Sequence, residues 1–341
     1  MDTVILQEPG QFTLRETAPP SAPGPGEALV RVHRVGVCGT DLHAFRGEQP
    51  FFTYPRVLGH ELGVEVIALG PETPGAPVVG SRCAVEPYLN CGHCVACRAG
   101  KTNCCVRLQT LGVHTDGGMR EYFTVPATKL HPSAVLSYDQ LALVEMLGIG
   151  AHAVRRAALA PGEWALVIGA GPIGLSVIQF ATLAGARVIV ADLDAHRLAF
   201  CRDHLGVTHP IDAREDPLGA ITALTDGDLP TAVFDATGSV ASMNGAIRYV
   251  ASGGRLIFVG LTQKEVCFAD PELHRKELTV LASRNATADD LTRIIAQIEA
   301  GKIDTDPWIT HRAPLAAVPE EFAGWLQPEA RVIKAMISVG D

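Results

Sequence analysis

The stretch Gly169-Ala170-Gly171-Pro172-Ile173-Gly174 decides the fold of this chain of 341 residues. It follows the apolar run Ala165–Ile168, which predicts a strand, and it opens Ile173–Ala184, which has the length of a helix. In this context the first glycine permits a tight turn, the second lets a pyrophosphate approach the backbone, and the third lets helix and strand pack closely. Amide groups at the helix N-terminus then attract the phosphates. A glycine turn without a ligand is the alternative, which this context disfavours. The stretch therefore predicts a dinucleotide site that includes Gly169, Gly171, Pro172, Ile173 and Gly174.

Compact apolar runs and helix-length segments alternate from about residue 147 onward. Short apolar runs of this kind suit strands that are covered on both faces of a parallel sheet. The alternation predicts the α/β class, with a doubly wound parallel sheet. The expected strands are Ala165–Ile168, Arg187–Ala191, Ala232–Asp235, Arg255–Val259 and Leu278–Ala282, and the expected helices between them are Ile173–Ala184, Ala195–His204 and Ser239–Val250.

The segment from residue 1 to about residue 145 has a different pattern of predicted secondary structure, which is rich in strands and loops. Ala28–Val37, Glu61–Leu69 and Tyr122–Val125 predict strands, and Pro and Gly punctuate the chain between them. Near the C-terminus, Asp289–Glu299 predicts a further helix and Val332–Ser338 a last strand. The change of pattern predicts two domains, as the length also suggests.

The composition excludes several classes of protein. Hydrophobic residues make up 47% of the chain and charged residues 19%, which excludes global disorder. The net charge of −9 argues against nucleic acid or an anionic membrane surface as the main partner. Trp164–Ala186 carries no charge and is long enough to span a bilayer, but its glycines and proline favour a strand, a turn and a buried helix. The N-terminus shows no secretory signal, and free thiols fit the cytoplasm.

An acidic residue, Asp192, ends the second strand of the alternating region. A carboxylate at this point accepts hydrogen bonds from the adenosine ribose and repels a 2′-phosphate, so NAD is favoured over NADP. A helix-capping aspartate is the alternative interpretation. Arg197 is expected to cover the ribose or the adenine. The remaining residues that we assign to the cofactor are Thr237, Val259, Ser283 and Asn285.

Four cysteines form the pattern Cys91-x2-Cys94-x2-Cys97-x7-Cys105. Four soft ligands at this spacing can close around a tetrahedral Zn²⁺ and leave no open position, so this zinc would be structural. An iron–sulfur cluster is the alternative, which the last spacing disfavours. Cys104 stands beside Cys105, so Cys104 is an alternative to Cys105 as the fourth ligand.

A second set of potential ligands comes from separate parts of the sequence. Cys38 follows the strand Ala28–Val37, His60-Glu61 lies further on, and Glu145 stands at the junction of the two domains. Thiolate, imidazole and carboxylate together suit a catalytic zinc that keeps one coordination position open. Asp41 is expected to orient this loop or His43.

In these motifs the chain resembles the zinc-dependent medium-chain dehydrogenase/reductase superfamily, to which alcohol and polyol dehydrogenases belong. The resemblance rests on Val37–His43, Gly59–Glu61, the four cysteines, Glu145 and Gly169–Gly174. It implies a GroES-like, β-rich catalytic domain over residues 1–147 and 285–341 and a Rossmann NAD-binding domain over residues 148–284. It also implies two zinc ions per chain and a homodimer or homotetramer. The catalytic zinc would lie on Cys38 and His60, with Glu61 or Glu145 as the third protein ligand.

The resemblance further implies hydride transfer from an alcohol to NAD. Thr40, two residues after Cys38, would accept the proton of the substrate through its hydroxyl. His43 would pass this proton to solvent, because imidazole titrates near neutral pH. Glu145 would hold a zinc-bound water or exchange with it.

A finer resemblance concerns the substrate and points to the bacterial L-galactonate and L-gulonate 5-dehydrogenases. Arg284 follows the last Rossmann strand, and its guanidinium suits a carboxylate, while an interdomain or cofactor contact is the alternative. Alditols such as galactitol or sorbitol, and L-threonine, are alternative substrates, and an inactive NAD-sensing protein or a zinc hydrolase are alternatives of other classes. The matching stretches are Gln49–Glu61, Gly112–Gly118, Asp270–Glu277 and Ser283–Thr287, and the further residues that we assign to the substrate are Phe45, Phe51 and His114.

Overall fold

The computed structural model describes residues 1–49 and 52–340, so the expected substrate residue Phe51 lies outside the described residues. The chain divides into two compact units. Unit 1 comprises residues 1–145 and 286–341, and unit 2 comprises residues 146–285. The boundaries expected from the sequence are 147/148 and 284/285. Helix α3 (Tyr138–Ala157) runs across the first boundary.

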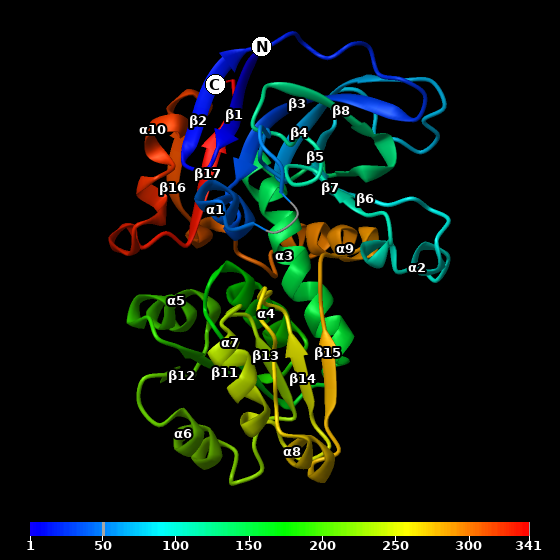
Figure 1. Ribbon diagram of the computed structural model, residues 1–341. Coiled ribbons are helices and arrows are strands. Elements are labelled where there is room, and N and C mark those ends of the chain that lie inside the picture. The colour runs from blue at the N-terminus through cyan, green and yellow to red at the C-terminus, as the bar shows by residue number, and fades with distance from the viewer. Residues whose placement is uncertain (50–51, 341) are drawn as a thin grey trace. The chain divides into compact units, whose positions relative to one another are not determined.

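Unit 2 is built on a six-stranded sheet in the order β12-β11-β10-β13-β14-β15 (Figure 1). Every neighbouring pair of strands in it is parallel. The order reverses direction at β10, which is the switch point where doubly wound folds bind their ligands. The strands are β10 (Trp164–Ile168), β11 (Arg187–Asp192), β12 (His209–Asp212), β13 (Ala232–Asp235), β14 (Arg255–Phe258) and β15 (Thr279–Ala282).

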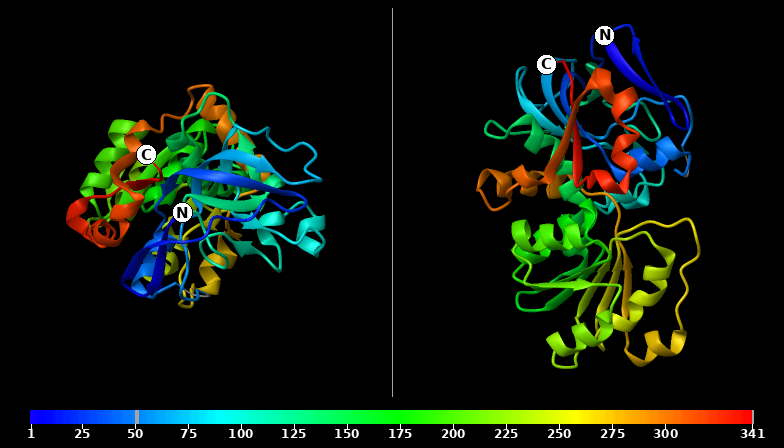
Figure 2. Two further views of the ribbon diagram at one scale, coloured as in Figure 1. Left: turned by 90° about the horizontal axis from the view of Figure 1, so that it is seen from above. Right: turned by 90° about the vertical axis from the view of Figure 1, so that its left-hand side faces the viewer.

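Helices cover both faces of this sheet, as the right-hand view of Figure 2 shows. They bury the central strands, whose side chains are almost all inaccessible, as expected for a parallel sheet. Local signals set the helix limits: α5 begins at Asp194, whose carboxylate accepts from two backbone amides, and stops at Gly206 in a left-handed conformation. The helices are α4 (Pro172–Leu183), α5 (Ala195–Leu205), α6 (Pro217–Leu224), α7 (Val240–Gly245) and α8 (Asp270–Arg275).

The glycine turn between β10 and α4 requires its glycines for steric reasons. Gly169 has φ +93°, a conformation that other residues rarely adopt. A Cβ atom on Gly174 would lie 1.8 Å from the carbonyl oxygen of Gly169. Pro172 occupies the first turn of α4, where its fixed φ and missing amide hydrogen fit. The backbone amides at the start of α4 are therefore left facing the end of the sheet.

Unit 1 is built around β3, which pairs with β4, β8 and β17 in a mainly antiparallel, seven-stranded sheet. The hairpin β1–β2 and the short pair β6–β7 form two small sheets beside it. The strands are β1 (Asp2–Glu8), β2 (Gln11–Glu16), β3 (Glu27–Gly36), β4 (Glu61–Leu69), β5 (Arg82–Val85), β6 (Tyr88–Leu89), β7 (Gln109–Thr110), β8 (Tyr122–Pro126), β9 (Leu130–Pro132), β16 (Ile309–Pro314) and β17 (Lys334–Ser338). The helices are α1 (Gly39–Arg46), α2 (Val95–Arg98), α9 (Ala288–Glu299) and α10 (Val318–Glu321).

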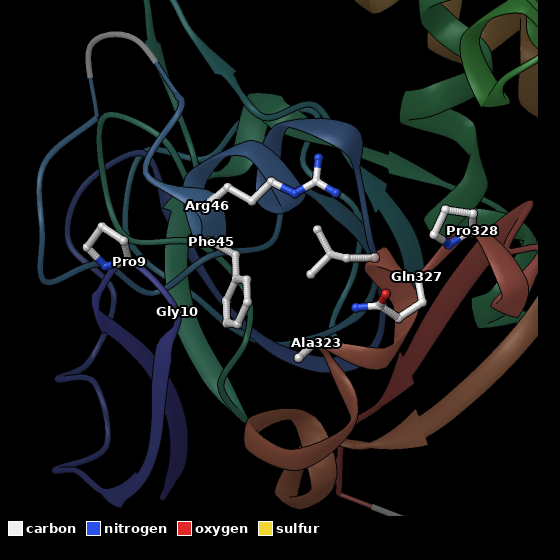
Figure 3. Close-up of a pocket in the computed structure, with 8 residues that line it drawn as sticks. Pro9, Gly10, Phe45, Arg46, Ala323, Gln327 and Pro328 are labelled. Carbon is white, nitrogen blue, oxygen red and sulfur yellow. The ribbon is translucent and has the colours of Figure 1, made fainter.

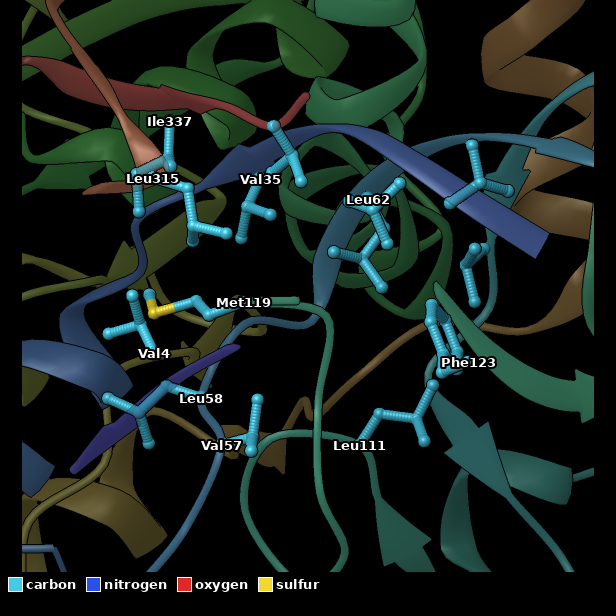
Figure 4. Close-up of a cluster of buried hydrophobic side chains, with 14 of the residues drawn as sticks. Val4, Val35, Val57, Leu58, Leu62, Leu111, Met119, Phe123, Leu315 and Ile337 are labelled. Atoms are coloured by element: carbon cyan, nitrogen blue, oxygen red, sulfur yellow. The ribbon is translucent and has the colours of Figure 1, made fainter. Parts of the chain in front are cut away.

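The apolar core of unit 1 lies between these strands and the loops that join them. Figure 4 shows side chains from distant parts of the sequence, such as Val4, Leu62, Phe123 and Ile337, meeting in one cluster. All four are at most 1% exposed. This cluster holds the loop before β4 and the start of β4 together, and those two segments carry His60 and Glu61.

The structure differs from the sequence-based expectation in one helix of unit 2, and it contains elements that the sequence did not predict, among them β12, α6, α8 and α3. The helix expected over Ser239–Val250 is α7 followed by a tighter 3-10 helix at Ala246–Tyr249, with Gly245 at the change of geometry. Helix α3, which carries Glu145, was not among the expected elements. None of the helices in residues 1–49 and 52–340 has the length and apolar content that a membrane span requires.

Candidate active site

Three potential metal ligands of unit 1 converge on one point. The sulfur of Cys38, a ring nitrogen of His60 and a carboxylate oxygen of Glu61 all lie within 4.8 Å of one another. Cys38 directly precedes α1, while His60 and Glu61 stand at the start of β4. Gly36 makes room for this arrangement, because a Cβ atom there would lie 2.2 Å from the Glu61 carboxylate. The structure therefore brings together three of the four residues expected at the open zinc site.

Asp41 lies behind His60. One of its oxygens accepts a hydrogen bond of 2.9 Å from the backbone N–H of Cys38, and the other lies 3.8 Å from Nδ1 of His60. Among the described residues, that second oxygen and His60 Nδ1 are buried without a hydrogen-bond partner. Burial opposes the charged imidazolium, but Asp41 and Cys38 outweigh it and raise the pKa of His60 well above its usual value. Metal ligation that turns His60 would bring its Nδ1–H onto Asp41, the usual support of a metal-binding histidine.

Glu61 has a second partner that sequence reasoning did not identify. The ammonium of Lys334 donates to both carboxylate oxygens of Glu61 at 2.8 Å, and to the carbonyl of Val37 at 3.0 Å. Both side chains are almost completely buried. Burial lowers the pKa of Lys334, but the charges of Glu61 and Cys38 more than offset this effect and raise it. Lys334 thus fastens the segment before Cys38 to the start of β4.

Glu145 has a different environment. Its carboxylate accepts a hydrogen bond from the hydroxyl of Tyr88, and both side chains are buried. In the described residues, the converging group contains Glu61 and not Glu145. Burial raises the pKa of Glu145, although the charge of His60 acts in the opposite direction. The proposed alternatives for the third ligand therefore differ in geometry: Glu61 is in place and Glu145 is held by Tyr88.

Thr40 and His43 both lie on α1, immediately after Cys38. Thr40 is half-buried and His43 is exposed. Residues three apart on a helix share one face, so the hydroxyl and the imidazole are neighbours on the helix surface. Thr40 thus lies nearer the potential metal ligands in sequence, and His43 lies at the solvent-exposed surface.

The four cysteines of the second site also converge. The sulfur atoms of Cys91, Cys94, Cys97 and Cys105 lie within 4.8 Å of one another. The backbone N–H groups of Cys97 and Val106 lower the pKa of the Cys94 thiol to about 6. Cys104 is exposed, whereas Cys105 is buried in the group, so the structure resolves which of the two neighbours joins it. We call this segment, residues 91–105, the cysteine lobe.

A polar network supports the cysteine lobe from the side of β6. The amide of Asn90 donates to the sulfur of Cys97 at 3.7 Å. Lys129 donates to the Asn90 side-chain oxygen at 2.8 Å and to the Glu86 carboxylate at 2.6 Å. His131 lies 3.5 Å from the second oxygen of Glu86. This network places the residues on either side of Tyr88.

The expected cofactor residues of unit 2 gather at the carboxyl ends of its strands. Asp192 is buried, and its two oxygens accept from the amides of Ala170 at 2.5 Å and Asp194 at 2.8 Å. The carboxylate therefore lies directly beside the glycine turn. The nearest atom to a Cβ built on Gly171 would be the Arg197 guanidinium at 3.8 Å, so Arg197 also reaches this turn.

The other four cofactor candidates end the strands on the far side of the switch point. Thr237 donates its hydroxyl to Asp235 at 2.7 Å, and Val259 donates its amide to the Asp235 carbonyl at 2.9 Å. The hydroxyl of Ser283 and the amide nitrogen of Asn285 are buried without a partner among the described residues. Such atoms are the kind that a bound ligand satisfies. Sequence reasoning did not identify Asp235, which is fully buried and also accepts from Ser242 at 2.5 Å.

The expected substrate residues are spread over the chain. Arg284 is exposed between Ser283 and Asn285 in unit 2. His114 is exposed in unit 1, and its Nδ1 accepts from the backbone N–H of Thr110 at 3.0 Å. The ring of Phe45 packs between Phe12 and Phe322, with centroids 5.5 and 5.1 Å away.

Phe45 also lines a cavity of about 580 Å³ at the C-terminal end of α1 (Figure 3). The cavity is mainly apolar, with the side chains of Arg46 and Gln327 as its polar groups. Its lining residues are Pro9, Gly10, Phe45, Arg46, Ala323, Leu326, Gln327 and Pro328. The converging residues Cys38, His60 and Glu61 are not among them, so this cavity does not contain the potential metal ligands.

Two family models match the chain. The alcohol dehydrogenase GroES-like domain matches residues 24–135, and the zinc-binding dehydrogenase matches residues 172–300. Together they cover more than half of the chain, which therefore belongs to the zinc-type medium-chain alcohol dehydrogenase family. The fold class expected from the sequence, a GroES-like domain with a Rossmann domain, is confirmed, as is the expected class of alcohol or polyol oxidoreductase.

Particular relatives extend over the whole length. The chain is 41% identical to L-galactonate-5-dehydrogenase of Escherichia coli K12 over 338 residues, 99% of both chains. A solved structure of a short chain alcohol dehydrogenase (rspB) from Escherichia coli CFT073, complexed with NADH, superimposes with a TM-score of 0.91 at 30% identity and 99% coverage of both chains. A protein from Sinorhizobium meliloti 1021 bound to NADP has a TM-score of 0.90 at 28% identity, over 99% of this chain and 98% of its own.

Proposed function

We propose that this chain oxidises the carbon-5 hydroxyl of a sugar acid of the L-galactonate or L-gulonate type, with NAD as the hydride acceptor and zinc at the active site. The observation that carries the chemistry is the convergence of Cys38, His60 and Glu61 within 4.8 Å. The 41% identity to an L-galactonate-5-dehydrogenase over the full length supports the substrate class.

The residues of unit 1 fit a catalytic zinc. Thiolate, imidazole and carboxylate form a three-ligand set that leaves a tetrahedral ion one open position. One buried oxygen of Asp41 has no hydrogen-bond partner among the described residues, and it supplies the acceptor that a ligating histidine needs for its other ring nitrogen. Zinc held by these residues would supply the Lewis-acid chemistry that lowers the pKa of an alcohol hydroxyl, and NAD held by unit 2 would supply the hydride acceptor. The cysteine lobe would hold a second, structural zinc, which gives two ions per chain.

The chain's own groups then move the proton. The Thr40 hydroxyl is assigned to accept it from the substrate, because Thr40 stands on the first turn of α1 beside Cys38. The exposed imidazole of His43, one helical turn further, passes it to solvent. The homo-oligomer implied by the resemblance stays a prediction.

Replacing Asp192 with Asn is expected to lower kcat/KM for NAD by about 10–100-fold, since a hydrogen bond to a charged group contributes about 1.5–3 kcal/mol. The kcat/KM for NADP should fall less, because removing the charge of Asp192 also removes its repulsion of the 2′-phosphate. Steady-state kinetics with both cofactors measure the change in preference. A thermal melt is the control, since Asp192 also accepts from Ala170 and Asp194. An unchanged NAD/NADP ratio would contradict the role of Asp192.

Replacing Arg284 with Ala is expected to raise KM for a sugar acid by about tenfold, with little change for an uncharged alditol. A guanidinium recognises a carboxylate through paired, charge-assisted hydrogen bonds, and an alditol lacks that group. Arg284→Lys is the matched control, because it keeps the charge and loses the paired geometry. Equal losses for sugar acid and alditol would instead indicate a cofactor or structural contact.

The direct test follows NADH formation at 340 nm with a panel of L-galactonate, L-gulonate, galactitol, sorbitol and L-threonine. Turnover confined to the two sugar acids is expected. Preference for an alditol or for threonine would refute the substrate class while keeping the dehydrogenase chemistry. Tight NADH binding without turnover of any compound would favour a sensing protein.

A further inference from the structure

The two buried glutamates of unit 1 have different partners. Glu61 is bound to Lys334 and belongs to the group with Cys38 and His60. Glu145 accepts from the hydroxyl of Tyr88. Tyr88 is 2% exposed and Glu145 4%, so this contact is shielded from bulk water. Burial raises the pKa of Glu145, and the charges of His60 and Glu61 shift it in opposite directions.

A second buried carboxylate in unit 1 has a consequence for the metal. The converging group offers three protein ligands, and catalysis needs the fourth position of a tetrahedral zinc for the substrate. An unrestrained Glu145 would compete for that position, because an anionic oxygen is a good zinc ligand. The hydrogen bond from the Tyr88 hydroxyl gives the Glu145 carboxylate a partner other than the metal.

We propose that the Tyr88 hydroxyl is a positioning group that holds the Glu145 carboxylate off the metal and so reserves the fourth coordination position for substrate. This inference rests on the proposed zinc dehydrogenase function. It assigns Glu61 as the glutamate that binds the metal and Glu145 as a glutamate that Tyr88 keeps away from it.

The backbone around Tyr88 is fastened on both sides. Tyr88 pairs with Thr110 between β6 and β7, and the carbonyl of the preceding Pro87 accepts from Leu111 at 3.1 Å. The ammonium of Lys129 bridges Glu86 and Asn90, which flank Tyr88 by two residues on either side. The hydroxyl is therefore presented from a rigid support, as positioning requires.

Removal of the hydroxyl alone would leave a buried carboxylate without this donor. Such a group costs free energy until it finds another partner. A cation held by Cys38, His60 and Glu61 would be the strongest partner for this carboxylate. Tyr88→Phe should therefore move Glu145 onto the metal and close the open position.

Cobalt(II) in place of zinc makes the coordination visible. The spectrum of the Cys38→Ser protein contains only the bands of the cysteine lobe. Subtracting it from the spectrum of the protein with Cys38 therefore leaves the bands of the active-site ion. Tyr88→Phe is expected to change the visible bands in this difference spectrum. It should also slow release of the ion to a chelator by about tenfold, which is the size of the effect that residues contacting the ligands have on metal affinity. KM for the alcohol substrate should rise more than kcat falls, because the added ligand competes with substrate.

Two further variants separate this role from a general loss of packing. Tyr138→Phe is the matched control in the same unit: its ring stacks on His33, and loss of its hydroxyl should leave the spectrum unchanged. In a Glu145→Gln background, Tyr88→Phe should have no further effect on the spectrum or on metal release, because the competing carboxylate is gone.

If the thiolate–cobalt band is present and does not differ between wild type and Tyr88→Phe, the role of Tyr88 is overturned while the proposed metal site stands. A persistent Tyr88→Phe effect in the Glu145→Gln background would also overturn it. Absence of any Cys38-dependent cobalt band in the wild type would overturn the proposed metal site and, with it, the role of Tyr88.

Discussion

Replacing Lys334 with Met is expected to lower the free energy of unfolding by about 3–5 kcal/mol, the usual cost of removing one partner from a buried ion pair. Lys334 and Glu61 are almost completely inaccessible, and all three donors of the ammonium have acceptors on Glu61 and Val37. Met fills a similar volume but leaves the Glu61 carboxylate buried without its counter-charge. Urea unfolding of the metal-free protein measures the loss.

Two comparisons show whether the effect comes from the unpaired charge. Lys276→Met removes another buried lysine, whose ammonium donates to the carbonyls of Val250 and Arg248 and to no carboxylate in the described part of the chain, and should cost about 1–2 kcal/mol. Adding Glu61→Gln to Lys334→Met should recover part of the lost stability, because it removes the charge. Equal losses in both lysine variants, and no recovery in the double variant, would mean that Lys334 contributes only packing.

Zinc bound by Cys38, His60 and Glu61 should reduce the loss of stability in Lys334→Met, because the ion compensates the charge of the same carboxylate.

Unit 2 is the part of the fold that the sequence predicts best. Its strands are short apolar runs because both faces of a parallel sheet are buried, and the turn before α4 admits only glycine at Gly169 and Gly174. Helix α3 is harder to predict, because Gly148 and Gly150 interrupt its apolar pattern and weaken its helix propensity. Its stability comes from tertiary packing, since Leu141 and Leu147 are fully buried.

The candidate site divides in a similar way. The potential ligands Cys38, His60 and Glu61 can be predicted because their residue types suit zinc and because their motifs resemble those of the zinc-dependent dehydrogenases. Their supports cannot, because they are contacts between residues far apart in sequence: 273 positions separate Lys334 from Glu61 and 57 separate Tyr88 from Glu145. The one available signal was a lysine inside the apolar strand expected over Val332–Ser338. A buried lysine requires an acid, but the sequence does not say which one.

Replacing Cys38 with Ser is expected to remove the catalytic zinc and to lower kcat/KM by at least about 10³-fold. A Lewis acid supplies several kcal/mol of charge stabilisation in the transition state, and each 1.36 kcal/mol corresponds to about tenfold in rate. A serine hydroxyl is a much poorer ligand than a thiolate, and the remaining imidazole and carboxylate offer too few contacts to hold the ion. Metal analysis by atomic spectroscopy, together with NADH formation at 340 nm, measures both effects.

The cysteine lobe provides the reciprocal variant. Cys97→Ser should also reduce the zinc content from two ions to one, but by emptying the other site, which the convergence of Cys91, Cys94, Cys97 and Cys105 predicts to be structural. Its first effect should be local: faster amide exchange and proteolysis over residues 91–105, because the ion there contributes folding free energy directly. Loss of all activity in Cys38→Ser with two zinc ions retained would place the metal elsewhere. A single zinc in the wild type that disappears in Cys38→Ser would mean that the cysteine lobe is empty, and its four thiols would then be open to oxidation instead of being protected by an ion.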